Sequence, residues 1–123
     1  MKILIVAATE EEIRMLRRIS PEEHQLRFLV TGPGMVATSY ELSNHLRDNN
    51  YEVAINCGVA GSFDRSIKIG EVVNVTTDTF SEMGAQDGAE FIKYVDLNLG
   101  GATLFNNQIT IDFSKLKNLN KSI

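Results

Sequence analysis

The chain has 123 residues, of which 43% are hydrophobic and 23% charged, and its formal net charge is −4. This length and composition predict one globular domain with a hydrophobic core and exclude an intrinsically disordered chain. The acidic balance excludes a protein that binds nucleic acid or anionic membranes through its net charge, so we expect neither as a partner.

The cysteine content and the short apolar runs indicate the compartment. Cys57 is the single cysteine, so no intrachain disulfide forms, as suits a reducing environment. The longest apolar run, at 3–8, is too short to cross a bilayer. Three glutamates follow it where a signal peptide would have a small-residue cleavage site. We therefore expect a cytoplasmic protein.

The first half of the chain alternates between strand-like and helix-like segments. The β-branched and apolar run at 3–8 predicts a strand that is buried on both faces of a parallel sheet. We then expect a helix over about 10–19, a strand over 26–31, a helix over 35–48 and a strand over 53–57. This order is typical of a doubly wound α/β sheet, which binds ligands at the carboxyl ends of its strands.

The second half of the chain has fewer regular patterns. Residues 71–77 predict a fourth strand. Farther along, Ile109, Ile111 and Phe113 alternate with polar residues, and this alternation predicts a short edge strand or hairpin.

The glutamates after the first strand have a structural interpretation. Thr9 is a good N-cap, and Thr9 with Glu12 matches the capping-box pattern, in which the glutamate reaches back to the cap amide. Glu10, Glu11 and Glu12 also complement the dipole of the helix that they begin. Helix physics accounts for this cluster without any chemistry.

Glu12 differs from the other two glutamates in the direction that it faces on a regular helix. At 100° per residue it lies near the centre of an apolar arc formed by Ile13, Met15, Leu16 and Ile19. A carboxylate that faces a core is costly unless it is paired or lines a cavity. The helix N-terminus helps to keep it ionised, as a general base requires. Glu12 is thus the candidate catalytic residue, and the capping interpretation stays open beside it.

Glycine-rich segments follow the second and third predicted strands. Residues 31–37 (TGPGMVA) loosely match the dinucleotide fingerprint, but they follow the wrong strand and no acidic residue ends the next strand to hold a ribose. We expect no nicotinamide or flavin cofactor. Residues 56–63 (NCGVAGSF) leave the backbone open to a ligand and lack the ending of a phosphate-binding loop. His24 and His45 lack ligand spacing, so we expect no metal.

These segments together resemble the purine nucleoside phosphorylase superfamily, and its hydrolase branch in particular. The similar stretches are MKILIVAATEEEI at 1–13, TGPGMVAT at 31–38, INCGVAGSF at 55–63 and IGEVVNVTTDTFSEMGAQDG at 69–88. Within this branch, the stretches resemble those of the futalosine hydrolases and of the methylthioadenosine/S-adenosylhomocysteine nucleosidases. The FSEMGAQDG stretch favours the futalosine hydrolases.

The resemblance implies a three-layer α/β fold with a central mixed sheet, usually in dimers, of which residues 1–123 form the N-terminal part. It implies hydrolysis of a ribosidic C–N bond through an oxocarbenium-like transition state, with release of a purine such as hypoxanthine in menaquinone biosynthesis. Glu12 falls where the family has the glutamate that orients the attacking water, and segment 80–88 where a dimer mate helps to close the pocket. The positions that fall where the family lines the ribose and the nucleophile are Ala8, Thr9, Pro33, Val59, Ala60 and Gly61.

Two other functions stay open. A purine nucleoside phosphorylase would need cations and amides to hold phosphate, and the three strand-end segments contain no Arg or Lys, which favours water as the nucleophile. A non-catalytic nucleoside-binding module would keep the scaffold without the chemistry. The resemblance implies that the aspartate which protonates the leaving purine lies in a second half of the domain, so we expect a truncated form with little activity alone.

The same reasoning predicts self-association. A sheet without the neighbouring strands of its family leaves apolar surface open, so we expect the purified chain to form homo-oligomers. Sedimentation velocity at several protein concentrations measures this association. A monomer at every concentration would contradict the prediction.

Overall fold

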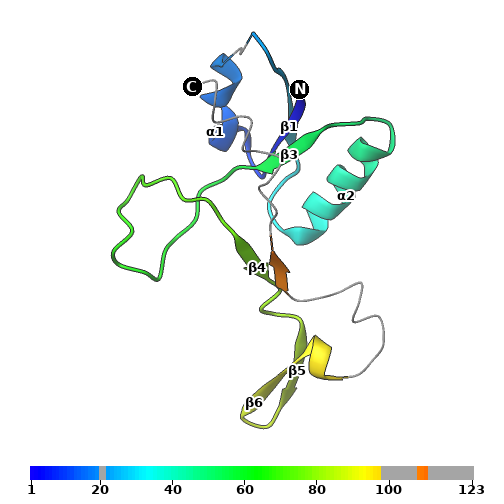
Figure 1. The fold of residues 1–123 in the computed structure, drawn as a ribbon. Coiled ribbons are helices and arrows are strands. Elements are labelled where there is room, and N and C mark those ends of the chain that lie inside the picture. Colours follow the sequence, from blue (N-terminus) through cyan, green and yellow to red (C-terminus); the bar gives the residue numbers. More distant parts are fainter. Residues whose placement is uncertain (20–21, 98–107, 111–123) are drawn as a thin grey trace. The chain divides into compact units, whose positions relative to one another are not determined.

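The computed structural model describes residues 1–19, 22–97 and 108–110, with the side chains of Thr79 and of residues 108–110 left aside. The chain divides into two compact units, Met1–Ser66 and Ile67–Ile123. The first unit combines helices with a parallel sheet, which confirms the predicted α/β class (Figure 1).

The sheet of the first unit has three parallel strands in the order β2-β1-β3. These strands are β1 (Lys2–Ala7), β2 (Gln25–Val30) and β3 (Val53–Asn56), so the predicted bounds are confirmed within one residue. In the register of the sheet, Ile5 of β1 lies opposite Phe28 of β2 and Ile55 of β3. The first strand in the sequence is therefore the central strand of the sheet.

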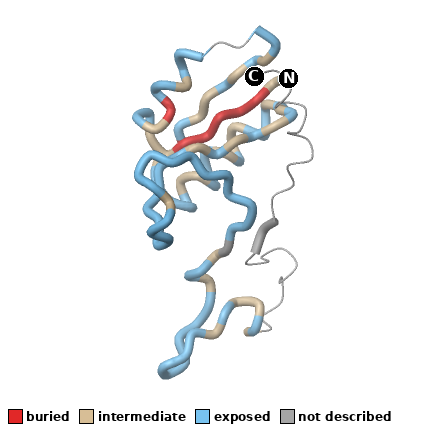
Figure 2. Tube along the Cα trace, turned by 60° about the vertical axis from the view of Figure 1, so that its left-hand side comes forward, coloured by how far each residue is buried: buried red, intermediate tan, exposed pale blue. Residues whose placement is uncertain are grey.

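The core of the first unit is built on β1. Ile3 to Ala7 are buried without interruption, and the Leu4 side chain is fully enclosed. Figure 2 shows these buried positions as one continuous stretch along β1. A central parallel strand has a neighbour on each edge and covered faces, so alternate residues on both faces must be apolar. The prediction of a strand buried on both faces is confirmed.

The segment after β1 differs from the predicted helix over 10–19. The α-helix α1 covers only Glu10–Ile13, a turn follows, and a short 3-10 helix, η1, covers Leu16–Arg18. The prediction of one continuous helix is wrong. Met15 and Ile19 are 62% and 54% exposed, so no packed apolar face supports a longer helix.

This break also changes the apolar arc that the helical wheel centred on Glu12. The side chain of α1 that is buried is Ile13, which lies 100° from Glu12 on the wheel. Glu12 itself is half-buried. The inference that Glu12 faces the same way as a buried arc is therefore wrong, and its position must be explained by its own hydrogen bonds.

The second helix, α2, covers Met35–Arg47, in agreement with the predicted helix over 35–48. In the view of Figure 1, α1 and α2 lie on opposite sides of β1, as the reversal of strand order at β1 requires. The hydroxyls of Thr31 and Thr38 are 3.1 Å apart and join the end of β2 to the first turn of α2. No helix within the described ranges is long and apolar enough to cross a membrane.

The second unit contains antiparallel pairs. Strand β4 (Thr77–Thr79) pairs with β7 (Gln108–Thr110), and β5 (Gly84–Asp87) forms a hairpin with β6 (Glu90–Lys93) before a second 3-10 helix, η2 (Tyr94–Leu97). A Cβ atom on Gly84 would lie 2.3 Å from the Ile92 carbonyl oxygen, so this position admits only glycine. The antiparallel pairs form sheets of their own, and the three-layer fold with a mixed sheet stays a prediction.

The strand predicted over 71–77 is wrong for residues 71–76, which are in neither a strand nor a helix. Val72 is 95% exposed, so its β propensity is not supported by packing or by a paired neighbour. The edge strand predicted around Ile109 is confirmed as β7, whereas Ile111 and Phe113 lie outside the described residues.

The enclosed Leu4 provides a test of this core. We expect Leu4→Ala to lower the free energy of unfolding by about 2–5 kcal/mol, because it removes apolar contacts and leaves a cavity in the core beside β1. Urea unfolding followed by far-UV circular dichroism measures the change. The matched control is Val36→Ala in α2, where the side chain is 85% exposed and a change within about 0.5 kcal/mol is expected. Equal effects of the two substitutions would contradict the assignment of the core to β1.

Candidate functional site

The carboxyl ends of the three parallel strands meet at one edge of the sheet. Beyond the strands, the Thr31 N–H donates to the Ala7 carbonyl at 2.9 Å, and the Cys57 N–H donates to the Val6 carbonyl at 2.8 Å. The strand-end segments that the sequence singled out therefore begin side by side. This edge is where doubly wound sheets bind their ligands.

Glu12 joins two of these segments through its carboxylate. Its Oε2 atom accepts hydrogen bonds from the Thr9 backbone N–H at 2.8 Å and from the Thr9 hydroxyl at 3.1 Å, within the predicted capping box. Its Oε1 atom accepts the Val59 backbone N–H at 3.3 Å, across 47 positions of sequence. The capping interpretation is confirmed, and the same side chain also reaches the loop after β3.

Hydrogen bonds to backbone amides favour the charged form of this carboxyl. They hold the pKa of Glu12 below its ordinary value of 4.5, with the Thr9 amide as the largest cause and the Val59 amide as the next, while partial desolvation acts in the opposite direction. Glu12 is therefore an ionised acceptor at neutral pH. A carboxylate in this state can orient a water molecule and accept its proton when a reaction makes that water acidic.

The predicted lining residues lie in the same strand-end segments but differ in what they can contribute. Ala8 and Thr9 are half-buried beside the end of β1, and Val59 contributes its amide to Glu12. Pro33, Ala60 and Gly61 are exposed and have no polar side-chain atom, so they can offer only shape and backbone groups to a ligand. Among these predicted residues, Thr9 and Val59 donate hydrogen bonds to Glu12, and the Ala8 backbone makes a smaller contribution that also favours its charged form.

Gly58 belongs to the loop that the sequence predicts to be open to a ligand, but its place beside Glu12 was not predicted. A Cβ atom at this position would lie 3.1 Å from Glu12 Oε1, which is tighter than most observed Cβ contacts. Gly58 therefore lets the backbone pass close to the carboxylate and brings the Val59 amide within reach. The only signal in the sequence was the small-residue composition of 56–63, which does not distinguish this glycine from Gly61.

The other two glutamates have surface roles. Glu10 forms a two-point ion pair with Arg17, at 2.6 and 2.9 Å, and both side chains are exposed. The same guanidinium lies over the Phe28 ring at 4.9 Å. Arg17 lowers the pKa of Glu10. Glu11 is exposed, so the catalytic hypothesis applies to Glu12 alone.

Cys57 does not have the environment of an activated nucleophile. Its thiol is half-buried at the end of β3, and burial raises its pKa. A reactive cysteine requires the opposite shift, because the thiolate is the nucleophile. Within the described ranges, no group of three or more His, Cys, Asp or Glu side chains is arranged to hold a metal ion.

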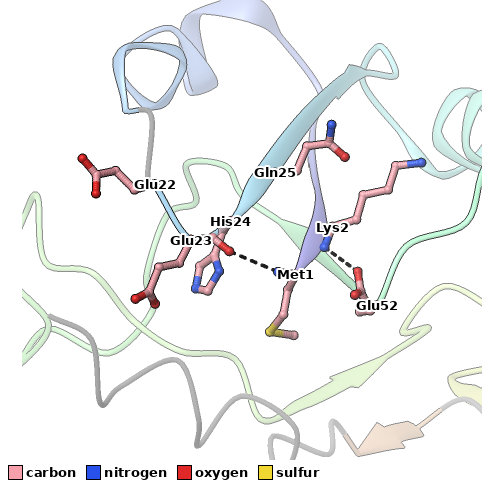
Figure 3. A pocket seen from close by; sticks show the side chains of 7 residues that line it. All are labelled: Met1, Lys2, Glu22, Glu23, His24, Gln25 and Glu52. Atoms are coloured by element: carbon pink, nitrogen blue, oxygen red, sulfur yellow. Dashed lines mark hydrogen bonds between the residues drawn. The ribbon is translucent and has the colours of Figure 1, made fainter.

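An open depression lies at the other edge of the sheet (Figure 3). Residues around the start of β1 line it. There the Met1 ammonium donates to the Glu23 carbonyl at 3.3 Å, and the Lys2 N–H donates to the Glu52 carboxylate. These residues precede or begin their strands, whereas Glu12 follows the carboxyl end of β1. The depression is therefore separate from the candidate site.

No protein-family model, no curated protein sequence and no solved structure matches this chain. Function is therefore inferred from the geometry around Glu12 together with the resemblance of the motifs.

The lowered pKa of Glu12 predicts a pH dependence of stability. A carboxyl with a lower pKa in the folded than in the unfolded chain stabilises the fold above the unfolded value, near 4.5, and this stabilisation is lost as the pH falls through the folded value. We expect Glu12→Gln to reduce the free energy of unfolding most at about pH 7 and least at about pH 3. Urea unfolding at both pH values measures this difference.

The control for this experiment is Glu11→Gln, which removes the same charge from the next residue in the first turn of α1. A loss of stability with the same size and pH dependence in both variants would show that net charge, rather than the bonds to Thr9 and Val59, governs the effect.

Proposed function

We propose that the segments around Glu12 form the water-activating part of a nucleoside N-ribosyl hydrolase site, with futalosine-type purine nucleosides as the favoured substrates. The observation that carries this proposal is the ionised Glu12 carboxylate at the carboxyl end of β1, which bonds to the Thr9 and Val59 amides. The resemblance of the strand-end motifs to the nucleoside hydrolases lends support to the same role for Glu12.

The carboxylate suits this reaction in two respects. Water that attacks C1′ of a ribose becomes acidic as its oxygen forms the new bond, and Glu12 can accept the proton at that stage despite its low pKa. The ribose also gains positive charge in an oxocarbenium-like transition state, and a fixed negative charge nearby stabilises it. Both effects require that Glu12 be ionised before substrate binds. The proposed reaction requires neither a metal nor a cofactor.

The surrounding residues are suited to a flat, polar sugar. Pro33, Ala60 and Gly61 are exposed in the loops after β2 and β3, where small side chains leave room for a ligand beside the backbone. Together with Ala8, Thr9 and Val59, we propose them as the residues that line the ribose. A phosphorylase would have to hold a phosphate anion beside the ionised Glu12, and this repulsion disfavours it.

A non-catalytic nucleoside-binding module is the second candidate, and the capping box favours it. The bonds between Glu12 and Thr9 give this glutamate a structural role that needs no reaction. The two candidates differ in whether the charge of Glu12 is required for turnover.

An activated riboside separates the two candidates. The leaving group of 4-nitrophenyl β-D-ribofuranoside departs without protonation, so its hydrolysis depends on water activation alone. We expect the chain to release 4-nitrophenolate and Glu12→Gln to lower the rate by about 100-fold or more, because the amide cannot accept the proton. Absorbance of the released nitrophenolate measures the rate.

Glu11→Gln is the matched control and should keep the wild-type rate within about twofold, because Glu11 is exposed. Equal rates for Glu12→Gln and the unsubstituted chain would refute the hydrolase proposal. Binding of inosine, followed by amide chemical shifts, with no turnover of the riboside would instead support the binding module.

A further inference from the structure

The two oxygens of the Glu12 carboxylate have different surroundings. Oε2 receives two donors from Thr9, the backbone N–H at 2.8 Å and the hydroxyl at 3.1 Å. Oε1 accepts the Val59 N–H at 3.3 Å, beyond the usual range for N–H···O bonds, and the Ala8 backbone adds a smaller contribution to the charged form of the carboxyl. A carboxylate oxygen has two lone-pair sites, so Thr9 occupies Oε2 fully and Oε1 keeps capacity for a further donor.

The loop after β3 leaves Oε1 accessible. Gly58 has no side chain, and a Cβ atom at its position would lie 3.1 Å from Oε1 and 3.7 Å from Cδ of Glu12. Gly58 and Val59 are both exposed. A water molecule can therefore approach Oε1 from the side of this loop.

We propose that Thr9 is a positioning residue that selects Oε1 as the oxygen of Glu12 which meets the attacking water. This inference rests on the proposed hydrolase function. In the reaction, the water oxygen forms a bond to C1′ as the C1′–N bond breaks, the bonding pair leaves with the base nitrogen, and the water proton passes to Oε1. Without the Thr9 hydroxyl, Oε2 keeps only the Thr9 backbone N–H, so the plane of the carboxyl group is held less firmly toward the water.

A purely capping role for Thr9 makes a different prediction. As the N-cap of α1, Thr9 is replaceable by any residue that caps well, and glycine caps nearly as well as threonine. Thr9→Gly thus keeps the cap preference and removes the hydroxyl. Thr9→Val keeps the β-branched shape and removes the hydroxyl, whereas Thr9→Ser keeps the hydroxyl. The positioning role requires that Thr9→Ser, which keeps a hydroxyl, behave like the wild type, and that Thr9→Val and Thr9→Gly, which lack it, both differ from the wild type.

The experiment follows the Glu12 carboxyl carbon by NMR across a pH titration of the full chain. We expect the pKa of Glu12 to rise in Thr9→Val and Thr9→Gly, because the charged form loses a donor, and to return to the wild-type value in Thr9→Ser. The other titratable side chains on α1 are Glu10 and Glu11, and Cys57 directly follows β3; all three are unchanged in the variants. Far-UV circular dichroism verifies that each variant is folded.

The same variants are assayed with 4-nitrophenyl β-D-ribofuranoside. We expect kcat to fall by about tenfold or more in Thr9→Val and Thr9→Gly, with KM within about twofold, and Thr9→Ser to restore kcat. An unchanged Glu12 pKa in Thr9→Val, or wild-type behaviour of Thr9→Gly, would overturn the role of Thr9 while hydrolysis that depends on Glu12 still supports the proposed function. A pKa response without any such hydrolysis would refute the proposed function instead.

Discussion

The pairing of β1 with strands on both of its edges is the constraint on which the rest of the first unit depends. Because β2 and β3 both run parallel to β1, their carboxyl ends come to one edge, and the segments that follow them begin as neighbours. Because β1 has a paired strand on each side, its backbone polar groups are hydrogen-bonded within the sheet. Its side chains can therefore be apolar on both faces and form the core. The candidate site and the hydrophobic core thus have one origin.

Glu12 shows how one side chain can serve the fold and a reaction together. Its bonds to Thr9 complete a local helix cap, and its bond to Val59 joins the start of α1 to the loop after β3. Amide donors from two segments lower the pKa of the carboxyl without any cation. The structural role therefore supplies the ionised state and the fixed orientation that the proposed chemistry would use, rather than competing with it.

The sequence predictions were wrong where a helix or strand depends on packing or pairing with another element, which the periodicity of the sequence does not show. The apolar residues Met15 and Ile19 match a helical pattern, but they are exposed, and the helix ends early at Ile13. Residues 71–76 have strong β propensity, but propensity stabilises a strand only when a neighbour pairs with it. By contrast, β1, β2 and β3 were predicted closely, since each pairs within the sheet of the first unit, and the bounds of α2 were also predicted closely.

The sequence by itself determined the features that depend on short spacing along the chain. Thr9 and Glu12 are three residues apart, so their capping box could be predicted, and the continuous apolar run of β1 predicted a strand that is buried on both faces. Only the tertiary structure decided that the Glu12 carboxylate reaches the Val59 amide and that Gly58 makes room for it. These contacts join positions nearly fifty residues apart, and they exist because the parallel pairing of β1 with β3 brings the ends of these two strands together.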